Sequence, residues 1–220
     1  MCSVRGGTWL NQKVKEQSMF SFSGNSVEVD GREMAVSLLS AEPAIAVFEN
    51  VLDDAECDAV IEVSRAHLKR SKIGTDKREH AMRTSSGVFL DEHYSPVVSE
   101  VERRLSVMMG MPLTNAEDLH VLHYQPGEEY RAHMDSFTRA EVNNRIATMI
   151  VYLNDVEEGG ETVFPKLGLS IPPKRGTAVY FEYFYSEQKT NALTLHAGSP
   201  VVQGEKWAAT LWVRRQQIRE

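Results

Sequence analysis

Two side chains that can bind a metal ion stand one residue apart in the stretch RAHMDSF, at His133 and Asp135. If this stretch is a β-strand, both side chains point to the same side, because side chains alternate along a strand. An imidazole and a carboxylate on one face can bind one cation. Polar side chains on a half-buried strand are the simpler explanation of the pair by itself, so a metal site needs further residues.

A third ligand has to come from a distant part of the chain, and His196 in LTLHAGSPV is the best candidate. Two histidines and one carboxylate on one side of a metal leave three positions open, which is the arrangement of non-haem Fe(II) oxygenases. The alternative for His196 is a hydrogen-bonded structural histidine beside a glycine. His120 and His123 in LHVLHY point to opposite faces of their own strand, so we interpret both as structural.

A lysine ten residues after His196 favours the metal interpretation. Lys206 follows the short turn VQGE, and alternation places Lys206, Ala208, Thr210 and Trp212 on one face of the next strand. A buried ammonium group is unfavourable without an anion. A dicarboxylate that chelates the metal at one end would supply this anion at its other end. The alternative is a lysine at a strand end whose charge reaches solvent along its aliphatic stem.

The elements that must position these residues are mainly β-strands, preceded by helices. One helix is expected within DDAECDAVIEVSRAHLKR, where Asp53 and Glu56 have capping-box spacing. Another is expected within SPVVSEVERRLSVMMG, from Ser95 and Pro96 to Gly110. Short strands are expected in EPAIAVFENVL, LHVLHY, YRAHMD, RIATMIVYL, LSIPP, TAVYFEYF, LTLHAGSPV and KWAATLWVRR. This pattern favours a sandwich or barrel with the helices on one outer face.

The chain divides into a polar arm at residues 1–40 and one domain at residues 41–220. The arm is expected to be loosely ordered, with a short strand near Val27–Val29. A net charge of −7 argues against nucleic acid as a partner. No apolar run is long enough to cross a membrane, so no membrane association is expected. Two cysteines without C-x-x-C spacing, and no secretory signal, indicate a reduced, cytoplasmic protein.

Together these segments resemble the iron- and 2-oxoglutarate-dependent dioxygenases. The chain is more closely similar to the small prolyl 4-hydroxylases of bacteria, algae and plants, and most of all to a Bacillus-type bacterial enzyme. The resemblance runs from about residue 43 to residue 215 and rests on NVLDDAECDAVIEVS, RTSSGVFL, LHVLHYQPGEEYRAHMDSF, NRIATMIVYLNDVEEGGETVFP, PKRGTAVYF and LHAGSPVVQGEKWAATLWVR. It implies a double-stranded β-helix, or jelly roll, covered by the N-terminal α-helices.

The resemblance also implies roles for individual residues. The Fe(II) ligands that it implies are His133, Asp135 and His196. Lys206 matches the partner of the distal carboxylate of 2-oxoglutarate, and Tyr124 and Thr162 match positions that line the cosubstrate pocket. Four further matches concern the substrate peptide. Tyr130, Arg145 and Trp212 match positions that face it, and Arg83 in RTSSG belongs to a loop that closes over it.

The implied activity is that of an oxidoreductase of the procollagen-proline 4-dioxygenase type. Such an enzyme hydroxylates proline at C4 in proline-rich or collagen-like peptides with Fe(II), 2-oxoglutarate, O₂ and ascorbate. The resemblance also makes a homodimer an expectation. Two alternatives stay open: a 2-oxoglutarate oxygenase that acts on another residue or a small molecule, and a catalytically silent module that binds proline-rich peptides. The complete set of ligands and the lysine argues against the silent module.

Overall fold

The computed structural model describes residues 24–72, 80–137, 143–183, 185 and 188–220. The helices are α1 (Asp54–Arg65), α2 (Pro96–Met108) and α3 (Gln188–Ala192), with a 3-10 turn η1 (Leu113–Asn115). The strands are β1 (Ser26–Val29), β2 (Arg32–Ala41), β3 (Ala44–Phe48), β4 (Lys69–Arg70), β5 (Ser86–Leu90), β6 (Leu119–Tyr124), β7 (Tyr130–His133), β8 (Arg145–Tyr152), β9 (Glu158–Gly159), β10 (Thr162–Phe164), β11 (Leu169–Ile171), β12 (Ala178–Glu182), β13 (His196–Gly198), β14 (Val201–Gln203) and β15 (Lys206–Arg214). Within the described ranges, no helix has both the length and the apolar character needed to cross a membrane.

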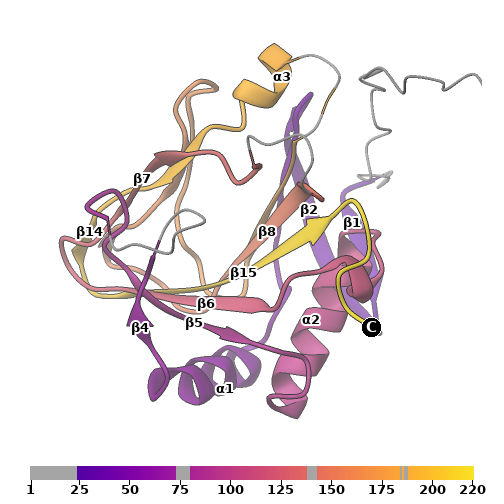
Figure 1. The fold of residues 1–220 in the computed structure, drawn as a ribbon, viewed down its shortest axis with the longest axis horizontal. Coiled ribbons are helices and arrows are strands. Elements are labelled where there is room, and N and C mark those ends of the chain that lie inside the picture. The colour runs from indigo at the N-terminus through magenta and orange to yellow at the C-terminus, as the bar shows by residue number, and fades with distance from the viewer. Residues whose placement is uncertain (1–23, 73–79, 138–142, 184, 186–187) are drawn as a thin grey trace, which may run out of the picture.

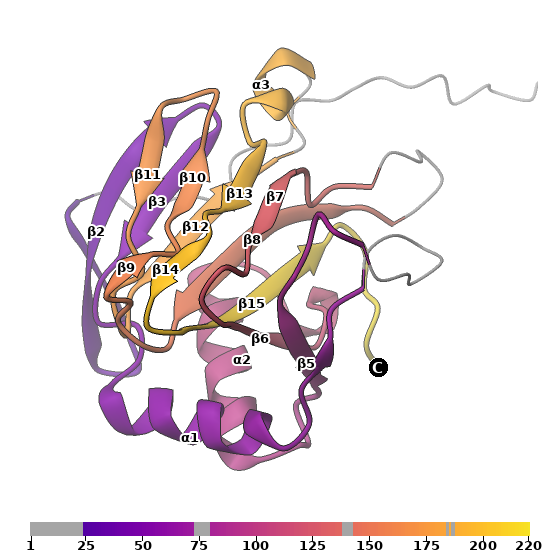
Figure 2. The ribbon, with the colours of Figure 1, turned by 90° about the vertical axis from the view of Figure 1, so that its left-hand side faces the viewer.

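Two sheets with antiparallel pairing form the framework of the described chain (Figures 1 and 2). The large sheet has nine strands in the order β1-β2-β3-β12-β8-β15-β6-β5-β4, and the small sheet has four in the order β11-β10-β13-β7. Apolar side chains from both sheets, including Tyr152, Phe164 and Phe181, pack together between them. The prediction of a mainly β protein with two facing layers is therefore confirmed.

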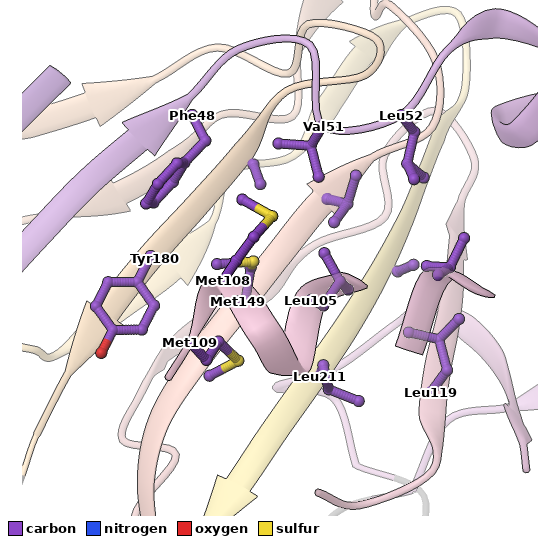
Figure 3. Close-up of a cluster of buried hydrophobic side chains, with 14 of the residues drawn as sticks. Phe48, Val51, Leu52, Leu105, Met108, Met109, Leu119, Met149, Tyr180 and Leu211 are labelled. Carbon is purple, nitrogen blue, oxygen red and sulfur yellow. The ribbon is translucent and has the colours of Figure 1, made fainter. Parts of the chain in front are cut away.

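The helices α1 and α2 lie against the other face of the large sheet (Figure 1). Asp53 and Glu56 form the predicted capping box at the start of α1, with reciprocal hydrogen bonds of 2.9 Å to each other's backbone N–H. α2 begins as predicted, with Ser95 as N-cap and Pro96 at its first turn. Figure 3 shows part of the apolar core between α2 and the sheet, which includes Leu105, Met108, Met109, Met149, Tyr180 and Leu211. The expected helical cover of one outer face is confirmed.

The large sheet extends further toward the N-terminus than the sequence suggested. Residues 1–23 of the expected arm lie outside the described residues, and β1 is the short strand expected near Val27–Val29. β2 then pairs with β3 and crosses the boundary expected at residue 40. Met34 and Val36 of β2 are buried while the side chains between and after them are exposed. A strand with a single buried face has a polar average composition, which explains why this stretch resembled an unstructured arm.

Strand pairing brings distant segments of the chain to one place. His196 in β13 lies opposite His133 in β7 within the small sheet. In the large sheet, β15 lies between β6 and β8, and Lys206 pairs with Tyr124 of β6. Residues 63 positions apart in the sequence, His133 and His196, thus become neighbours across one ladder. The space between the two sheets at this point holds the candidate site.

Candidate active site

His133, Asp135 and His196 lie together between the two sheets. Each offers a ligand atom, and these atoms all lie within 4.8 Å of one another. His133 Nε2 is 3.4 Å from Asp135 Oδ1, and His196 Nε2 is 3.7 Å from Asp135 Oδ2. Over the described ranges, this is the one group of three histidine, cysteine or acidic side chains close enough to hold a metal ion. The structure therefore brings the three predicted ligands together.

The local backbone differs from the expected strand at one point. β7 ends at His133, and Asp135 lies in the bend that follows it. We expected the alternation of side chains along one strand to bring His133 and Asp135 to the same side. This reason does not apply, because Asp135 lies beyond the end of the strand. The bend turns the carboxylate of Asp135 into the interior, where its side chain is only 6% exposed.

Hydrogen bonds fix the tautomer of both histidines. His133 Nδ1 lies 2.8 Å from the carbonyl oxygen of Arg131, and His196 Nδ1 lies 2.9 Å from that of Thr194. A carbonyl oxygen only accepts, so each Nδ1 carries the hydrogen and donates it. The lone pair is then on Nε2, the nitrogen that faces Asp135 in both residues. Orientation of this kind is what ligand histidines require.

The charges of the cluster also suit a divalent cation. Burial lowers the pKa of His196 to about 4, so its imidazole is neutral at neutral pH. Burial opposes ionisation of Asp135, but His196, His133 and Arg145 outweigh it and hold the pKa of this carboxyl well below its usual range. Two imidazoles and one carboxylate are the donor set of a non-haem Fe(II) site. The residues therefore fit the metal that the sequence suggested.

A cavity between the sheets joins this cluster to Lys206. The side chains of β15 that were predicted to share one face, Lys206, Ala208, Thr210 and Trp212, all line it. Tyr124 and Thr162 line the same cavity, as expected of cosubstrate contacts. Thr162 Oγ1 accepts a hydrogen bond of 2.7 Å from the hydroxyl of the buried Tyr152. The structure thus brings all the residues predicted to hold the cosubstrate to one cavity.

Lys206 is a buried cation that forms no ion pair with another side chain among the described residues. Its Nζ donates a hydrogen bond of 2.6 Å to the carbonyl oxygen of Gly160 and lies over the rings of Tyr124 and Tyr152. Burial lowers the pKa of Lys206 to about 8, and Glu161 opposes this shift only through its charge at a distance. A carboxylate entering the cavity would compensate the buried charge. The alternative, in which the charge of Lys206 reaches solvent along its aliphatic stem, is therefore wrong.

Tyr130 and Arg83 lie at the cavity beside the predicted metal ligands. The ring of Tyr130 stacks on the imidazole of His133 with centroids 3.5 Å apart, and the guanidinium of Arg83 lies 4.7 Å from the centroid of Tyr130. Both side chains line the cavity. Residues 73–79, which precede Arg83 in the loop expected to close over a peptide, lie outside the described residues.

Arg145 does not line the cavity, in contrast to its predicted contact with the peptide. Its guanidinium donates two hydrogen bonds of 2.6 Å to Glu117 and stacks on Trp212, with Cζ 3.8 Å from the ring centroid. Trp212 does line the cavity, but its Nε1 donates a hydrogen bond of 2.9 Å to Asp135 Oδ2. The charge of Arg145 is therefore neutralised by Glu117 outside the cavity.

Two residues of the site were missed by the sequence analysis. Thr148 in β8 donates a hydrogen bond of 2.8 Å to Asp135 Oδ2, and the hydroxyl of Tyr183 lies 3.0 Å from Thr148 Oγ1. Thr148 lies within RIATMIVYL, where period-2 alternation gives its face but not its partner. No sequence signal singled out either hydroxyl, because both contacts depend on strand pairing between distant segments.

Comparison with known proteins agrees with this geometry. The sequence profile of the 2OG-Fe(II) oxygenase superfamily matches residues 119–214. "Prolyl 4-hydroxylase 2" of Arabidopsis thaliana is 36% identical over 207 residues, which cover 81% of this chain and 69% of that protein. The chain belongs to the prolyl 4-hydroxylase family. "Probable prolyl 4-hydroxylase 4" of the same plant is 34% identical, over 90% of this chain and 76% of its own length.

A solved structure supports membership of the prolyl 4-hydroxylase family at the level of the fold. The viral collagen prolyl hydroxylase of Paramecium bursaria Chlorella virus-1, solved as a complex with 2OG, superimposes with a TM-score of 0.63 at 30% identity. The match covers 77% of this chain and 95% of that protein. The two facing sheets are accordingly the double-stranded β-helix of the 2-oxoglutarate oxygenases. These plant and viral relatives do not support the narrower Bacillus-type subgroup.

Proposed function

We propose that this prolyl 4-hydroxylase uses Fe(II) and 2-oxoglutarate to hydroxylate C4 of proline in a proline-rich or collagen-like peptide. The observation that carries the proposal is one cavity that joins His133, Asp135 and His196 to the buried ammonium of Lys206. His133, Asp135 and His196 would hold the iron. Lys206 would bind the distal carboxylate of 2-oxoglutarate, with Tyr124 and Thr162 beside it.

The protein contributes orientation and exclusion of water. When bound, iron, 2-oxoglutarate and O₂ supply the oxidation, and 2-oxoglutarate leaves as succinate and CO₂. The fixed Nδ1–H tautomers leave Nε2 of His133 and His196 free to bind the metal, so these two atoms would hold it. The walls of the cavity bury Lys206, which strengthens its attraction for a carboxylate relative to the same pair in water. No general base among the side chains is required for this chemistry.

The substrate class follows from the aromatic groups at the cavity. Tyr130 is half-buried beside His133, and Trp212 lines the cavity floor. Flat rings of this kind suit proline-rich peptides in the polyproline II conformation. Arg83, whose guanidinium lies 4.7 Å from the ring centroid of Tyr130, is proposed to close over such a peptide. The viral relative is described as a collagen prolyl hydroxylase, which supports collagen-like repeats as the first substrates to test.

Further parts of the proposal rest on the sequence resemblance and composition. Ascorbate is proposed as the reductant that restores Fe(II) after uncoupled turnover. We also propose a homodimer and a cytoplasmic location. Size-exclusion chromatography with light scattering tests the dimer, and succinate release with and without ascorbate tests the reductant.

The experiment that tests the activity combines two products. Succinate release is measured with Fe(II), 2-oxoglutarate and a collagen-like Gly-x-Pro peptide, against the same peptide with alanine in place of each proline. Mass spectrometry then locates the added oxygen atom. We expect peptide-stimulated succinate release and an oxygen atom on proline, and none of either in the His133→Ala variant. His123→Ala is the matched control, since His123 stacks on Trp207 away from the cavity.

The same experiment separates the alternative functions. An oxygen atom on another residue would reject the prolyl assignment while leaving the metal site intact. Iron binding with tight peptide binding, but without peptide-stimulated succinate release, would instead indicate a silent peptide-binding module. Turnover with a small molecule and none of the peptides would indicate a different oxygenase of the same superfamily.

A further inference from the structure

The carboxylate of Asp135 is held by side chains of the opposite sheet. Asp135 follows β7 of the small sheet, while its Oδ2 accepts hydrogen bonds from Thr148 and Trp212 of the large sheet, at 2.8 and 2.9 Å. Thr148 and Trp212 are directly paired residues of β8 and β15. Both donors therefore bind one oxygen of the carboxylate. The other oxygen, Oδ1, lies 3.4 Å from His133 Nε2, while Oδ2 lies 3.7 Å from His196 Nε2.

The direction of the hydrogen bonds extends this arrangement to Tyr183. Thr148 donates its single hydroxyl hydrogen to Asp135 Oδ2. Tyr183 lies 3.0 Å from Thr148 Oγ1, which has only its lone pairs left to offer. The phenol of Tyr183 must then donate to Thr148. One directed chain runs from Tyr183 through Thr148 to Asp135.

Neither hydroxyl group lies at the cavity. Thr148 is fully buried and Tyr183 is 3% exposed, and neither is among the side chains that line the cavity. Tyr183 follows β12, which pairs with β8, so three neighbouring strands supply Tyr183, Thr148 and Trp212. Hydrogen bonds in such a dry interior are stronger than in water and orient their acceptor. Here the acceptor at the end of the chain is Asp135, one of the three predicted metal ligands.

We propose that Thr148 and Tyr183 are positioning residues for the metal, which hold the carboxylate of Asp135 in one orientation between His133 and His196. A carboxylate free to rotate could bind through both oxygens and occupy one of the positions that cosubstrate and O₂ need. The inference rests on the proposed function only in that His133, Asp135 and His196 bind a metal. Trp212 also donates a hydrogen bond to Oδ2, but its ring lines the cavity, so a Trp212 variant would test the positioning role less specifically.

The test is metal binding by the full chain without cosubstrate. Mn(II) affinity is measured by titration calorimetry, and the absorption spectrum of bound Co(II) reports the ligand geometry. We expect Thr148→Val, which keeps the shape and removes the hydroxyl, to weaken Mn(II) binding about 10- to 100-fold. Thr148→Ser should restore nearly all of the loss. Tyr183→Phe should show a smaller loss, with a Co(II) spectrum shifted in the same direction as that of Thr148→Val.

The controls separate this inference from the proposed function. Thr177→Val removes another buried hydroxyl, which donates to the carbonyl oxygen of Lys174 away from the site, and should leave Mn(II) binding unchanged. Asp135→Ala should abolish binding, and a variant that still binds would reject the metal site itself. Unchanged or tighter Mn(II) binding by Thr148→Val, with Asp135→Ala inactive in binding, would overturn the positioning role alone. If Thr148→Val does not fold, Tyr183→Phe decides in the same way.

Discussion

Among individual residues, Lys206 makes the most direct prediction for catalysis. Its ammonium is buried at the cavity against the carbonyl of Gly160, where a carboxylate would compensate its charge. We expect Lys206→Ala to raise the 2-oxoglutarate concentration for half-maximal rate about 10- to 100-fold, since a hydrogen bond to a charged group contributes roughly 1.5–3 kcal/mol. Mn(II) binding should be unchanged. The exposed Lys174→Ala is the matched control, and equal cosubstrate dependence in both variants would refute the role of Lys206.

The same lysine predicts a pH dependence. Burial lowers the pKa of Lys206 in the free protein to about 8, so the cationic form that attracts a carboxylate is lost above this pH. The Michaelis constant for 2-oxoglutarate should stay flat below pH 8 and rise up to tenfold for each pH unit above it. Steady-state rates over this range measure it. Lys206→Arg, whose guanidinium remains charged, should give a flat profile. A flat profile in the unmodified protein would contradict the prediction.

How far the sequence predicts the site depends on what each residue's role requires. His133, Asp135 and His196 could be found because ligand chemistry is visible in residue type and spacing. Lys206 could be identified because burying a cation on an apolar strand is unfavourable unless an anion binds it. Arg145 was assigned to the peptide by the family resemblance alone, and its partner Glu117, 28 positions away, could not be identified from the sequence. Thr148 and Tyr183 were missed for the same reason, since pairing of distant strands decides what their hydroxyl groups contact.

Among the elements, the short ladder of β9 and β14 holds the loop that binds Lys206. Gly159 lies opposite Val201 in this ladder with φ 83°, and a Cβ at this position would lie against the carbonyl of Pro200 and 2.8 Å from the amide of Val202. Both contacts are with backbone atoms, which cannot move aside. The next residue, Gly160, provides the carbonyl oxygen for Lys206. The geometry of this ladder therefore sets the position of the lysine.

We expect Gly159→Ala to lower the melting temperature and also to weaken 2-oxoglutarate binding. Gly127→Ala is the matched control, because Gly127 has a similar φ of 82° but open space where a Cβ would stand. Both variants bear the cost of about 1–2 kcal/mol for an L-residue in this backbone region. Only Gly159→Ala adds a steric clash of the new Cβ with the backbone of Pro200 and Val202. Differential scanning calorimetry and the Michaelis constant for 2-oxoglutarate measure the difference, and similar values for the two variants would show that the ladder does not position Lys206.

Local signals predicted the helices better than the sheets. The capping box at Asp53 and the Ser95–Pro96 start of α2 depend on residues within one turn, and both were correct. LTLHAGSPV was expected to be one strand, but β13 and β14 belong to different sheets. Pro200 separates them, and its lack of an N–H interrupts a ladder. β1 and β2 were not recognised as part of the large sheet, because their pairing is a property of the whole fold.

Across the whole molecule, the C-terminal tail ties the large sheet to the helical layer. Arg219 lies beyond β15 and donates hydrogen bonds of 2.6 and 3.1 Å to Glu102 of α2, and one of 2.7 Å to the carbonyl oxygen of Glu117 before β6. Glu102 is fully buried and also accepts from the backbone N–H of Leu119. Burial raises the pKa of Glu102 despite the opposing effect of Arg219. The carboxylate therefore depends on the tail for its charged partner.

Arg219→Ala should lower the free energy of unfolding by about 3 kcal/mol, because it leaves a buried carboxylate without its counter-charge. Urea denaturation followed by circular dichroism measures this change. Arg103→Ala is the matched control on the exposed side of α2, where its ion pairs with Asp30 and Glu100 contribute less than about 1 kcal/mol. The double variant Glu102→Gln with Arg219→Ala should recover part of the loss, since the buried charge is then absent. Equal effects of Arg219→Ala and Arg103→Ala would mean that the tail does not stabilise the junction between sheet and helices.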